Sequence, residues 1–458
     1  MEEQMTKMNQ QPAENKMGVM PVNKLLISMS VPMMMSMLVQ ALYNIVDSVF
    51  VARVCEDALT AVSLAFPMQS LMIALAGGTG VGVNALVSKS LGEKDFNKAN
   101  AAAKNGIFLY GLSYLVFLIL GLLIVKPFYY AQTTDPEIVK YGIDYLTIVS
   151  TMSMGIFAQF IFERLLQSTG KTLYTMFTQM TGAVINLILD PILIFGLFGM
   201  PRMEAAGAAL ATVIGQIAAG SLACVLNVKK NKEININMKG FRPDKQIIAR
   251  IYKVGVPSII MQSIGSIMTF SMNQILIAFS TTATAVFGVY FKLQSFIFMP
   301  IFGLNNGMVP IIAYNYGARN KKRMMDTYKL SVLIATIIMT LGTVAFLTIP
   351  EVLFAFFNAS DHMLSMGVPA LRIIGIHFPI AAFCIITGSM FQALGNAVYS
   401  MINSICRQIV VLLPAAYLLA QLGNVDYVWW SFPIAEIASA ILTTIFLIKM
   451  KKDVIDKI

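Results

Sequence analysis

Long apolar segments separated by short polar ones run through the whole chain. Each is long enough to cross a bilayer as a helix, which takes about 20 residues, and the alternating pattern of barrel strands is absent. Prolines inside the segments, such as Pro32 and Pro257, do not exclude helices, because neighbouring helices can satisfy the freed carbonyl groups. The pattern predicts an all-α polytopic membrane protein with twelve transmembrane helices near residues 25–53, 59–88, 103–127, 138–165, 172–198, 205–228, 247–279, 283–312, 328–350, 366–392, 399–422 and 427–450.

Composition agrees with a membrane protein and argues against an enzyme. The 458 residues are 57% hydrophobic and 12% charged, against about 25% charged in typical soluble domains. The two histidines and four scattered cysteines show no spacing typical of a metal site or a hydrolytic triad. No phosphate-binding loop of the ATPase kind appears. We therefore expect a protein that is not an enzyme and has no cofactor beyond a coupling ion.

The distribution of charge predicts the orientation. Most of the 33 Lys and Arg residues fall on the side of the chain termini, including the 229–253 segment, and the opposite loops hold only Arg53, Lys126, Lys140 and Arg202. The side rich in Lys and Arg is cytoplasmic by the positive-inside rule. We expect both termini to be cytoplasmic, and the net charge of +10 reflects this topology, so no nucleic-acid partner is expected.

The two halves of the chain repeat each other at a separation of 225 residues. At this offset Pro32 meets Pro257, Gly92 meets Gly317, and "LLQSTGKTLYTM" meets "MFQALGNAVYSM". A repeat unit of six helices keeps both halves in the same orientation, as in secondary transporters with parallel repeats. We predict two six-helix lobes around a central cleft, with an N-lobe at 1–228, a cytoplasmic basic linker at 229–246 and a C-lobe at 247–458.

A polar stripe marks the first predicted helix. Ser36, Gln40, Tyr43 and Asp47 share one face, with Asn44 beside it. Such a stripe must face protein or water rather than lipid, and a charge at the bilayer centre costs about 2.5–3.5 kcal/mol. Asp47 is therefore a candidate for ion coupling, with a purely structural, hydrogen-bonded carboxylate as the alternative.

The fifth predicted helix carries a second carboxylate. Asn186 and Asp190 lie one helical turn apart, and Pro191 frees a backbone carbonyl. These hard oxygen ligands suit a proton or Na⁺, although a non-titrating clamp between helices would use the same residues. Thr212 in the sixth helix could join the site or simply bond its own backbone. No other metal site is expected.

The second half carries different in-span groups. Asp47 and Asp190 correspond to Met272 and Ala415 in the repeat, which indicates a specialised site in one lobe. Three charged residues of the C-lobe, Lys292, Arg407 and Glu436, lie within predicted spans. We expect them either to pair with one another or to contact the substrate. With the neutral groups nearby, the candidate substrate cleft comprises Gln40, Tyr43, Asn44, Gln262, Lys292, Arg407 and Glu436. Glu163 is expected to pair with Arg164 or Lys171.

Over its whole length the chain resembles the multidrug and toxic-compound extrusion (MATE) family. The motifs that carry the resemblance are the proline fifteen residues before Asp47, "QSTGKTLYTM", "NLILDPILIFG", "GAALAT", "VPIIAYNYGARN" and "WSFPIAE". The branch that it resembles is bacterial and archaeal, with a cation site in the N-lobe. A different branch has acidic residues in helices seven and ten, where this chain has Gln262, His377 and Arg372.

The resemblance implies a function and a set of site residues. Asp47, Asn186, Asp190 and Thr212 would bind H⁺ or Na⁺, and Pro32 would be a hinge in the first helix. The protein would be a monomer in the cytoplasmic membrane, exporting small amphipathic, often cationic drugs by antiport. The alternatives are a lipid-linked saccharide flippase of a related superfamily, for which Lys292 and Arg407 offer few cavity cations, and a membrane enzyme or scaffold.

Overall fold

The computed structural model describes residues 15–357 and 359–458, and within these ranges every regular element is helical. Ten of the described helices are long and apolar enough to cross a membrane, and two bent helix pairs bring the number of candidate spans to twelve. The prediction of an all-α polytopic fold is confirmed.

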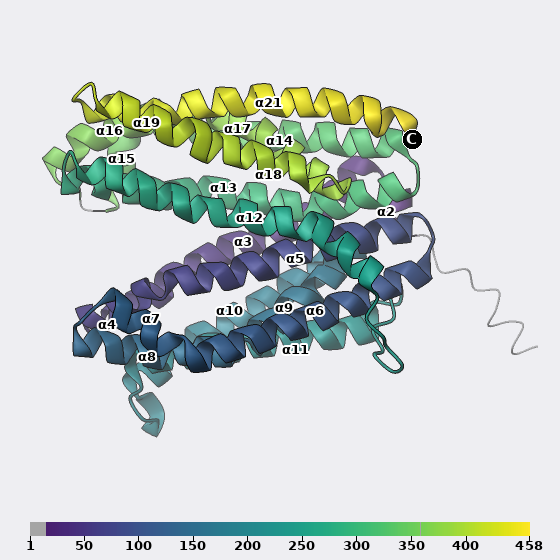
Figure 1. The fold of residues 1–458 in the computed structure, drawn as a ribbon, viewed down its shortest axis with the longest axis horizontal. Coiled ribbons are helices and arrows are strands. Elements are labelled where there is room, and N and C mark those ends of the chain that lie inside the picture. The colour runs from purple at the N-terminus through teal and green to yellow at the C-terminus, as the bar shows by residue number, and fades with distance from the viewer. Residues whose placement is uncertain (1–14, 358) are drawn as a thin grey trace, which may run out of the picture.

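The helices form two bundles that lie side by side (Figure 1). The N-lobe contains α2 (Lys16–Val19), α3 (Val22–Ala52), α4 (Glu56–Leu64), α5 (Phe66–Gly92), α6 (Phe96–Leu123), α7 (Val125–Gln132), α8 (Pro136–Thr151), α9 (Met154–Ser168), α10 (Thr172–Phe195), the short 3₁₀ helix Leu197–Gly199 and α11 (Glu204–Lys230). The C-lobe contains α12 (Lys245–Ile277), α13 (Thr281–Gly317), α14 (Lys321–Thr348), α15 (Pro350–Ala355), α16 (Asp361–Gly375), α17 (Phe378–Ala393), α18 (Ala397–Ile405), the π-helix Cys406–Leu412, α19 (Leu413–Ala420), α20 (Val425–Trp429), α21 (Ser431–Asp453) and a final 3₁₀ turn, Ile455–Lys457. The lobes meet where α5 packs on α12, and where α13 packs on α3 and α5.

Two spans that the sequence predicts as single helices are broken in the structure. The span near 138–165 divides into α8 and α9, which meet at 42°, and the span near 366–392 divides into α16 and α17, which meet at 50°. Pro379 in the first turn of α17 accounts for the second break, because proline fits a helix start but not its interior. The breaks occupy corresponding places in the two lobes, so the repeat extends to this irregularity.

The lobes touch most closely at one end of the molecule, which carries the turns 93–95 and 318–320 and the linker 231–244; we call it the basic end. A Cβ atom on Gly92 would lie 1.9 Å from the carbonyl oxygen of Tyr314, and one on Gly317 would lie 2.1 Å from that of Lys89. The two contacts exchange under the 225-residue repeat. Glycine at both positions therefore lets α5 and α13 cross backbone to backbone.

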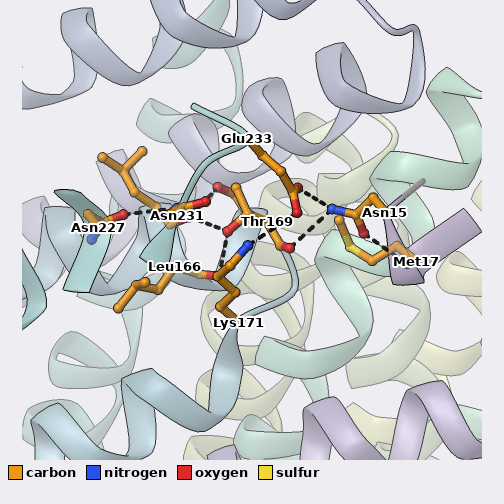
Figure 2. Close-up of polar contacts among 10 residues, drawn as sticks. Asn15, Met17, Leu166, Thr169, Lys171, Asn227, Asn231 and Glu233 are labelled. Carbon is orange, nitrogen blue, oxygen red and sulfur yellow. Dashed lines mark hydrogen bonds and ion pairs between the residues drawn. The ribbon is translucent and has the colours of Figure 1, made fainter. Parts of the chain in front are cut away.

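The segment at 15–20 attaches to the N-lobe at the basic end (Figure 2). Asn15 Nδ2 donates to the carbonyl oxygen of Thr169 at 3.2 Å and also to the Glu233 carboxylate, whose other oxygen lies 3.2 Å from Lys171 Nζ. Burial lowers the pKa of the neighbouring Lys16 ammonium, and the Lys171 charge lowers it further. The segment 15–20 is thus fixed to the loop after α9 and to the linker.

The same segment also attaches to the C-lobe. The carbonyl oxygen of Met17 accepts hydrogen bonds from Asn315 Nδ2 and from an Arg323 guanidinium nitrogen, each at 3.1 Å, and Arg323 also donates to the carbonyl oxygen of Met20 at 2.7 Å. Residues 15–20 therefore bridge the two lobes at the end where α5 and α13 cross.

Candidate functional site

The candidate cation residues come together where α3, α10 and α11 pack inside the N-lobe. Helix α3 continues through Pro32 and keeps Ser36, Gln40, Tyr43 and Asp47 on one face, as the sequence predicts. Helix α3 packs along α10. The polar stripe therefore faces protein, which is the only low-cost place for it within a bilayer.

Helices α10 and α11 approach each other through glycines. A Cβ on Gly215 would lie 2.7 Å from the carbonyl oxygen of Gly182, and one on Gly207 would lie 2.6 Å from that of Leu193. Small residues allow this distance, and it brings Thr212 of α11 to the Asn186 side chain on α10. Asp190, which is fully buried, lies one turn further along α10.

Asn186 connects Thr212 to Asp190. Its Nδ2 atom lies 3.2 Å from the Thr212 hydroxyl and 3.4 Å from Asp190 Oδ1. Rotation of the Asn186 amide by 180° gives a more complete set of hydrogen bonds. Nδ2 then donates to Asp190 Oδ2 at 3.3 Å, while Oδ1 accepts from the Thr212 backbone N–H at 3.1 Å and from the Thr212 hydroxyl at 3.2 Å. In both orientations the amide fixes the Asp190 carboxylate relative to α11.

Asp47 meets Asp190 across the α3–α10 contact. The two carboxyl groups interact with each other directly, and Tyr43 lies near both. The buried Asp47 Oδ1 atom has no hydrogen-bond partner within the described part of the chain. Two carboxylates that contact each other in a medium of low dielectric constant cannot both keep a full negative charge unless a proton or a cation lies between them.

A cavity of about 150 Å³ lies in the N-lobe beside this site, and it is lined by neighbours of the two carboxylates rather than by Asp47 or Asp190 themselves. Its lining includes Gln40, Tyr43, Asn186 and Thr212 at one end. At the other end it is lined by Gln159, Glu163, Arg164, Gln167, Gln179 and Asn306. Asn306 comes from α13 and accepts a hydrogen bond from Arg164 at 2.9 Å, so the cavity reaches the C-lobe.

Glu163 does not have the partners expected from the sequence. Its carboxylate accepts hydrogen bonds from Gln159 Nε2 at 3.0 Å, Thr178 Oγ1 at 3.0 Å and Gln179 Nε2 at 2.7 Å. Lys171 pairs with Glu233 instead. The expectation of an ion pair with Arg164 or Lys171 is wrong, because consecutive residues on a helix point in different directions and Glu163 faces α10.

The two amide residues that donate to this second carboxylate, Gln159 and Gln179, were not among the predicted site residues. Gln159 is one helical turn before Glu163, a spacing that could have been recognised. Gln179 lies on another helix, α10, so no local pattern connects it to Glu163.

The charged residues of the C-lobe form a pair away from the N-lobe cavity. An Arg407 guanidinium nitrogen lies 3.2 Å from Glu436 Oε2, and His377 Nδ1 lies 3.6 Å from the same oxygen. Arg407 lies in the π-helix that precedes Pro414, a wider turn of the kind that often occurs at functional or strained positions. The expected pairing is therefore present for Arg407 and Glu436, whereas Lys292 does not take part in it.

The other candidate cleft residues are dispersed. Gln40 and Tyr43 line the N-lobe cavity. Gln262 packs against Gly77 at the lobe interface, Lys292 Nζ lies 5.9 Å from the centre of the Phe357 ring, and Asn44 is exposed. No group of three His, Cys, Asp or Glu side chains in the described residues is placed to hold a metal ion.

Comparisons with known proteins give one consistent result. The MatE family model matches residues 32–192 and 257–418. The chain is 27% identical over 420 residues to the multidrug export protein MepA of Staphylococcus haemolyticus, covering 92% of both chains, and 27% identical over 418 residues to MepA of Staphylococcus aureus strain MRSA252, covering 91% of both.

Solved structures agree with these relatives. An outward-facing conformation of a multidrug resistance MATE family transporter superposes with a TM-score of 0.91 at 25% identity, covering 97% of this chain and 99% of that one. A crystal structure of a MATE protein in a bent conformation gives a TM-score of 0.87 at 26% identity, covering 95% and 96%.

Proposed function

Because this chain belongs to the MATE family, whose model matches most of both halves, we propose that it exports drugs in exchange for a coupling cation. The family and the two-lobe fold confirm the resemblance seen in the sequence, and identify a multi-pass membrane transport protein. The proposal adds the substrates, which are small amphipathic and often cationic drugs, and the coupling ion, H⁺ or Na⁺. The multidrug export activity named for the MepA relatives supports the choice of substrates.

The contact between Asp47 and Asp190 is the observation that carries the proposal. When the pair is empty, two neighbouring carboxylates repel each other at low dielectric constant; one H⁺ or Na⁺ removes that repulsion. Asn186 and Thr212 supply further oxygen and amide groups that could complete a Na⁺ site or fix the protonated form. The free energy of cation binding therefore depends on how closely α3 and α10 approach, and this couples the ion to the conformation of α3.

Export follows if drug and cation favour different arrangements of the lobes. A ligand shifts a conformational equilibrium only by its difference in affinity between the two states. In the proposed cycle, cation binding draws the Asp47 half of α3 toward α10, with Pro32 as the hinge. This movement narrows the cavity lined by Gln40 and Tyr43 and releases the drug.

In the proposed orientation, the basic end of the protein faces the cytoplasm. Its Lys and Arg content, together with the positive-inside rule, supports a bacterial or archaeal cytoplasmic membrane with both termini inside. The protein would act as a monomer, because each chain contains both lobes and the whole cation site.

The lipid-linked saccharide flippase is the weaker alternative. A pyrophosphate would need free cations in the central cleft, but Arg407 is paired with Glu436 and Lys292 lies against Phe357.

Drug efflux from right-side-out vesicles, with pH and Na⁺ gradients imposed separately, tests the proposal. Asp47→Asn and Asp190→Asn should each reduce gradient-driven efflux by tenfold or more, at equal expression. Asp144→Asn is the matched control, since Asp144 is exposed on α8. Wild-type efflux from both site variants would refute cation coupling at this pair, and the gradient that drives wild-type efflux identifies the ion.

A further inference from the structure

A second cavity lies between the lobes at the basic end and has no part in the proposed transport cycle. Its volume is about 460 Å³, three times that of the N-lobe cavity. Its lining comes from α5 and α6 of the N-lobe and from α12, α13 and the turn between α17 and α18 of the C-lobe.

Four cationic side chains surround this cavity. Lys89 and Lys98 belong to the N-lobe, and Arg250 and Lys253 belong to the first turns of α12 in the C-lobe. One carboxylate, Glu93, lies 3.7 Å from Lys89 and 2.9 Å from Lys98. Arg250 and Lys253 form no salt bridge with any residue that the structure describes, so the cavity has a surplus of positive charge.

The arrangement is held in place although these charges repel. Lys89 Nζ lies 4.7 Å from the centre of the Tyr316 ring on α13, which fixes its ammonium at the lobe interface. Like charges around one space raise its electrostatic free energy, and an anion bound between them would lower it. The remaining lining is largely apolar, with Ala85 and Leu86 on one side and Val254 and Leu394 on the other.

Cationic groups beside an apolar wall, at the basic end of spanning helices, suit a phosphate attached to an apolar body. Basic pockets between transmembrane helices on the cytoplasmic side are a known way to hold anionic lipid headgroups. We propose that this cavity binds the phosphate of an anionic phospholipid headgroup between Lys89 and Lys98 of one lobe and Arg250 and Lys253 of the other. Bound there, the headgroup joins the lobes and favours closure of the basic end.

Native mass spectrometry of the purified full chain tests the binding. The probes are phosphatidylglycerol, phosphatidylcholine and inorganic phosphate. The test variant is Arg250→Gln/Lys253→Gln, in which both side chains are exposed, and Lys253→Glu is a second, single variant. Lys229→Gln/Lys230→Gln is the control, because it removes two exposed charges at the end of α11, outside the cavity.

Phosphatidylglycerol should bind the wild type and the control equally. Each basic side chain near an anionic headgroup contributes about fivefold in affinity, so the double variant should bind it about 30-fold more weakly. The site would be overturned if phosphatidylglycerol bound the wild type and the Arg250→Gln/Lys253→Gln variant equally. It would also be overturned if the Lys229→Gln/Lys230→Gln control lost as much affinity as the double variant. If inorganic phosphate binds as tightly as phosphatidylglycerol, and loses affinity equally in the double variant, the site binds free phosphate. That result would overturn the assignment to a lipid headgroup.

Closure of the basic end has its own measurement. Spin labels on Asn97→Cys and Lys452→Cys, both exposed on opposite lobes, should report a shorter distance in nanodiscs of phosphatidylglycerol than of phosphatidylcholine. The double variant should lose this difference. A distance that is the same in both lipids would overturn the bridging role. Because neither measurement involves a drug or a cation gradient, both are independent of the proposed export.

Discussion

At the scale of single residues, buried polar groups are arranged in two ways. In the N-lobe, Asp47 and Asp190 face each other, and no basic residue in the described part of the chain forms a salt bridge with either, as the proposed cation site requires. In the C-lobe, Glu436 is neutralised by Arg407 at 3.2 Å. We therefore expect substitutions in the two lobes to affect different properties, namely transport in the first and stability in the second.

Thr212→Val should weaken cation binding without abolishing it. The substitution keeps the shape of the side chain but removes the hydroxyl that lies 3.2 Å from the Asn186 amide. One such hydrogen bond contributes about 1 kcal/mol, which is about fivefold in affinity, measured as the pH or Na⁺ concentration at half-maximal efflux. Thr181→Val is the control, because the Thr181 hydroxyl bonds only its own helix at Phe177. An unchanged half-maximal concentration would exclude Thr212 from the site.

Glu436→Gln should lower thermal stability. Glu436 is buried, and removal of one partner from a buried ion pair costs about 3–5 kcal/mol. Glu351→Gln breaks the exposed pair with Arg372, also 3.2 Å long, and should cost less than about 1 kcal/mol. Thermal unfolding of the purified variants distinguishes the two. A Glu436→Gln variant with unchanged melting temperature and lost drug binding would instead assign Glu436 to the substrate.

At the scale of helices, glycine positions decide how closely the lobes approach. Gly78 of α5 lies against the backbone of Ile259 on α12, and Gly303 of α13 lies against that of Met34 on α3. These two contacts exchange under the repeat, as those of Gly92 and Gly317 do. Two helix pairs thus close the lobe interface in nearly the same way, which is why repeated glycines in the sequence correspond to contacts between lobes.

Gly303→Ala should separate the lobes. A Cβ there would lie 2.5 Å from the Met34 Cα atom, and overpacking of this kind typically costs about 1–3 kcal/mol. Spin labels at positions 97 and 452 should show a longer distance, and the melting temperature should fall. Gly288→Ala on the same helix meets nothing within 4 Å and should be neutral or stabilising. A shift of the same size in both variants would argue against a contact specific to Gly303.

At the scale of the whole molecule, the basic end is closed by two kinds of contact. The helices α5 and α13 cross there, and the segment 15–20 bridges the lobes. Any state that opens the cleft toward this end must break both, so their strength helps to set the balance between the two openings.

Arg323→Gln should shift that balance. It removes a guanidinium that donates to the carbonyl oxygens of Met17 and Met20, and so loosens residues 15–20 from the C-lobe. The distance distribution between labels at positions 97 and 452 should broaden toward longer values. Arg319→Gln, at an exposed position in the turn that precedes α14, is the control for loss of charge. Identical distributions for both variants would show that the bridge does not contribute to closure.

The sequence by itself determined the helices, the two-lobe repeat and the face of α3 that carries Asp47. A bilayer leaves a spanning segment little choice but a helix, and helical periodicity then decides which residues share a face. Only the tertiary structure decided which faces meet. The contact of Asp47 with Asp190, the pairing of Arg407 with Glu436 and the hydrogen bond from Gln179 to Glu163 all join different helices. These contacts depend on how the helices rotate and pack, and local patterns do not specify either.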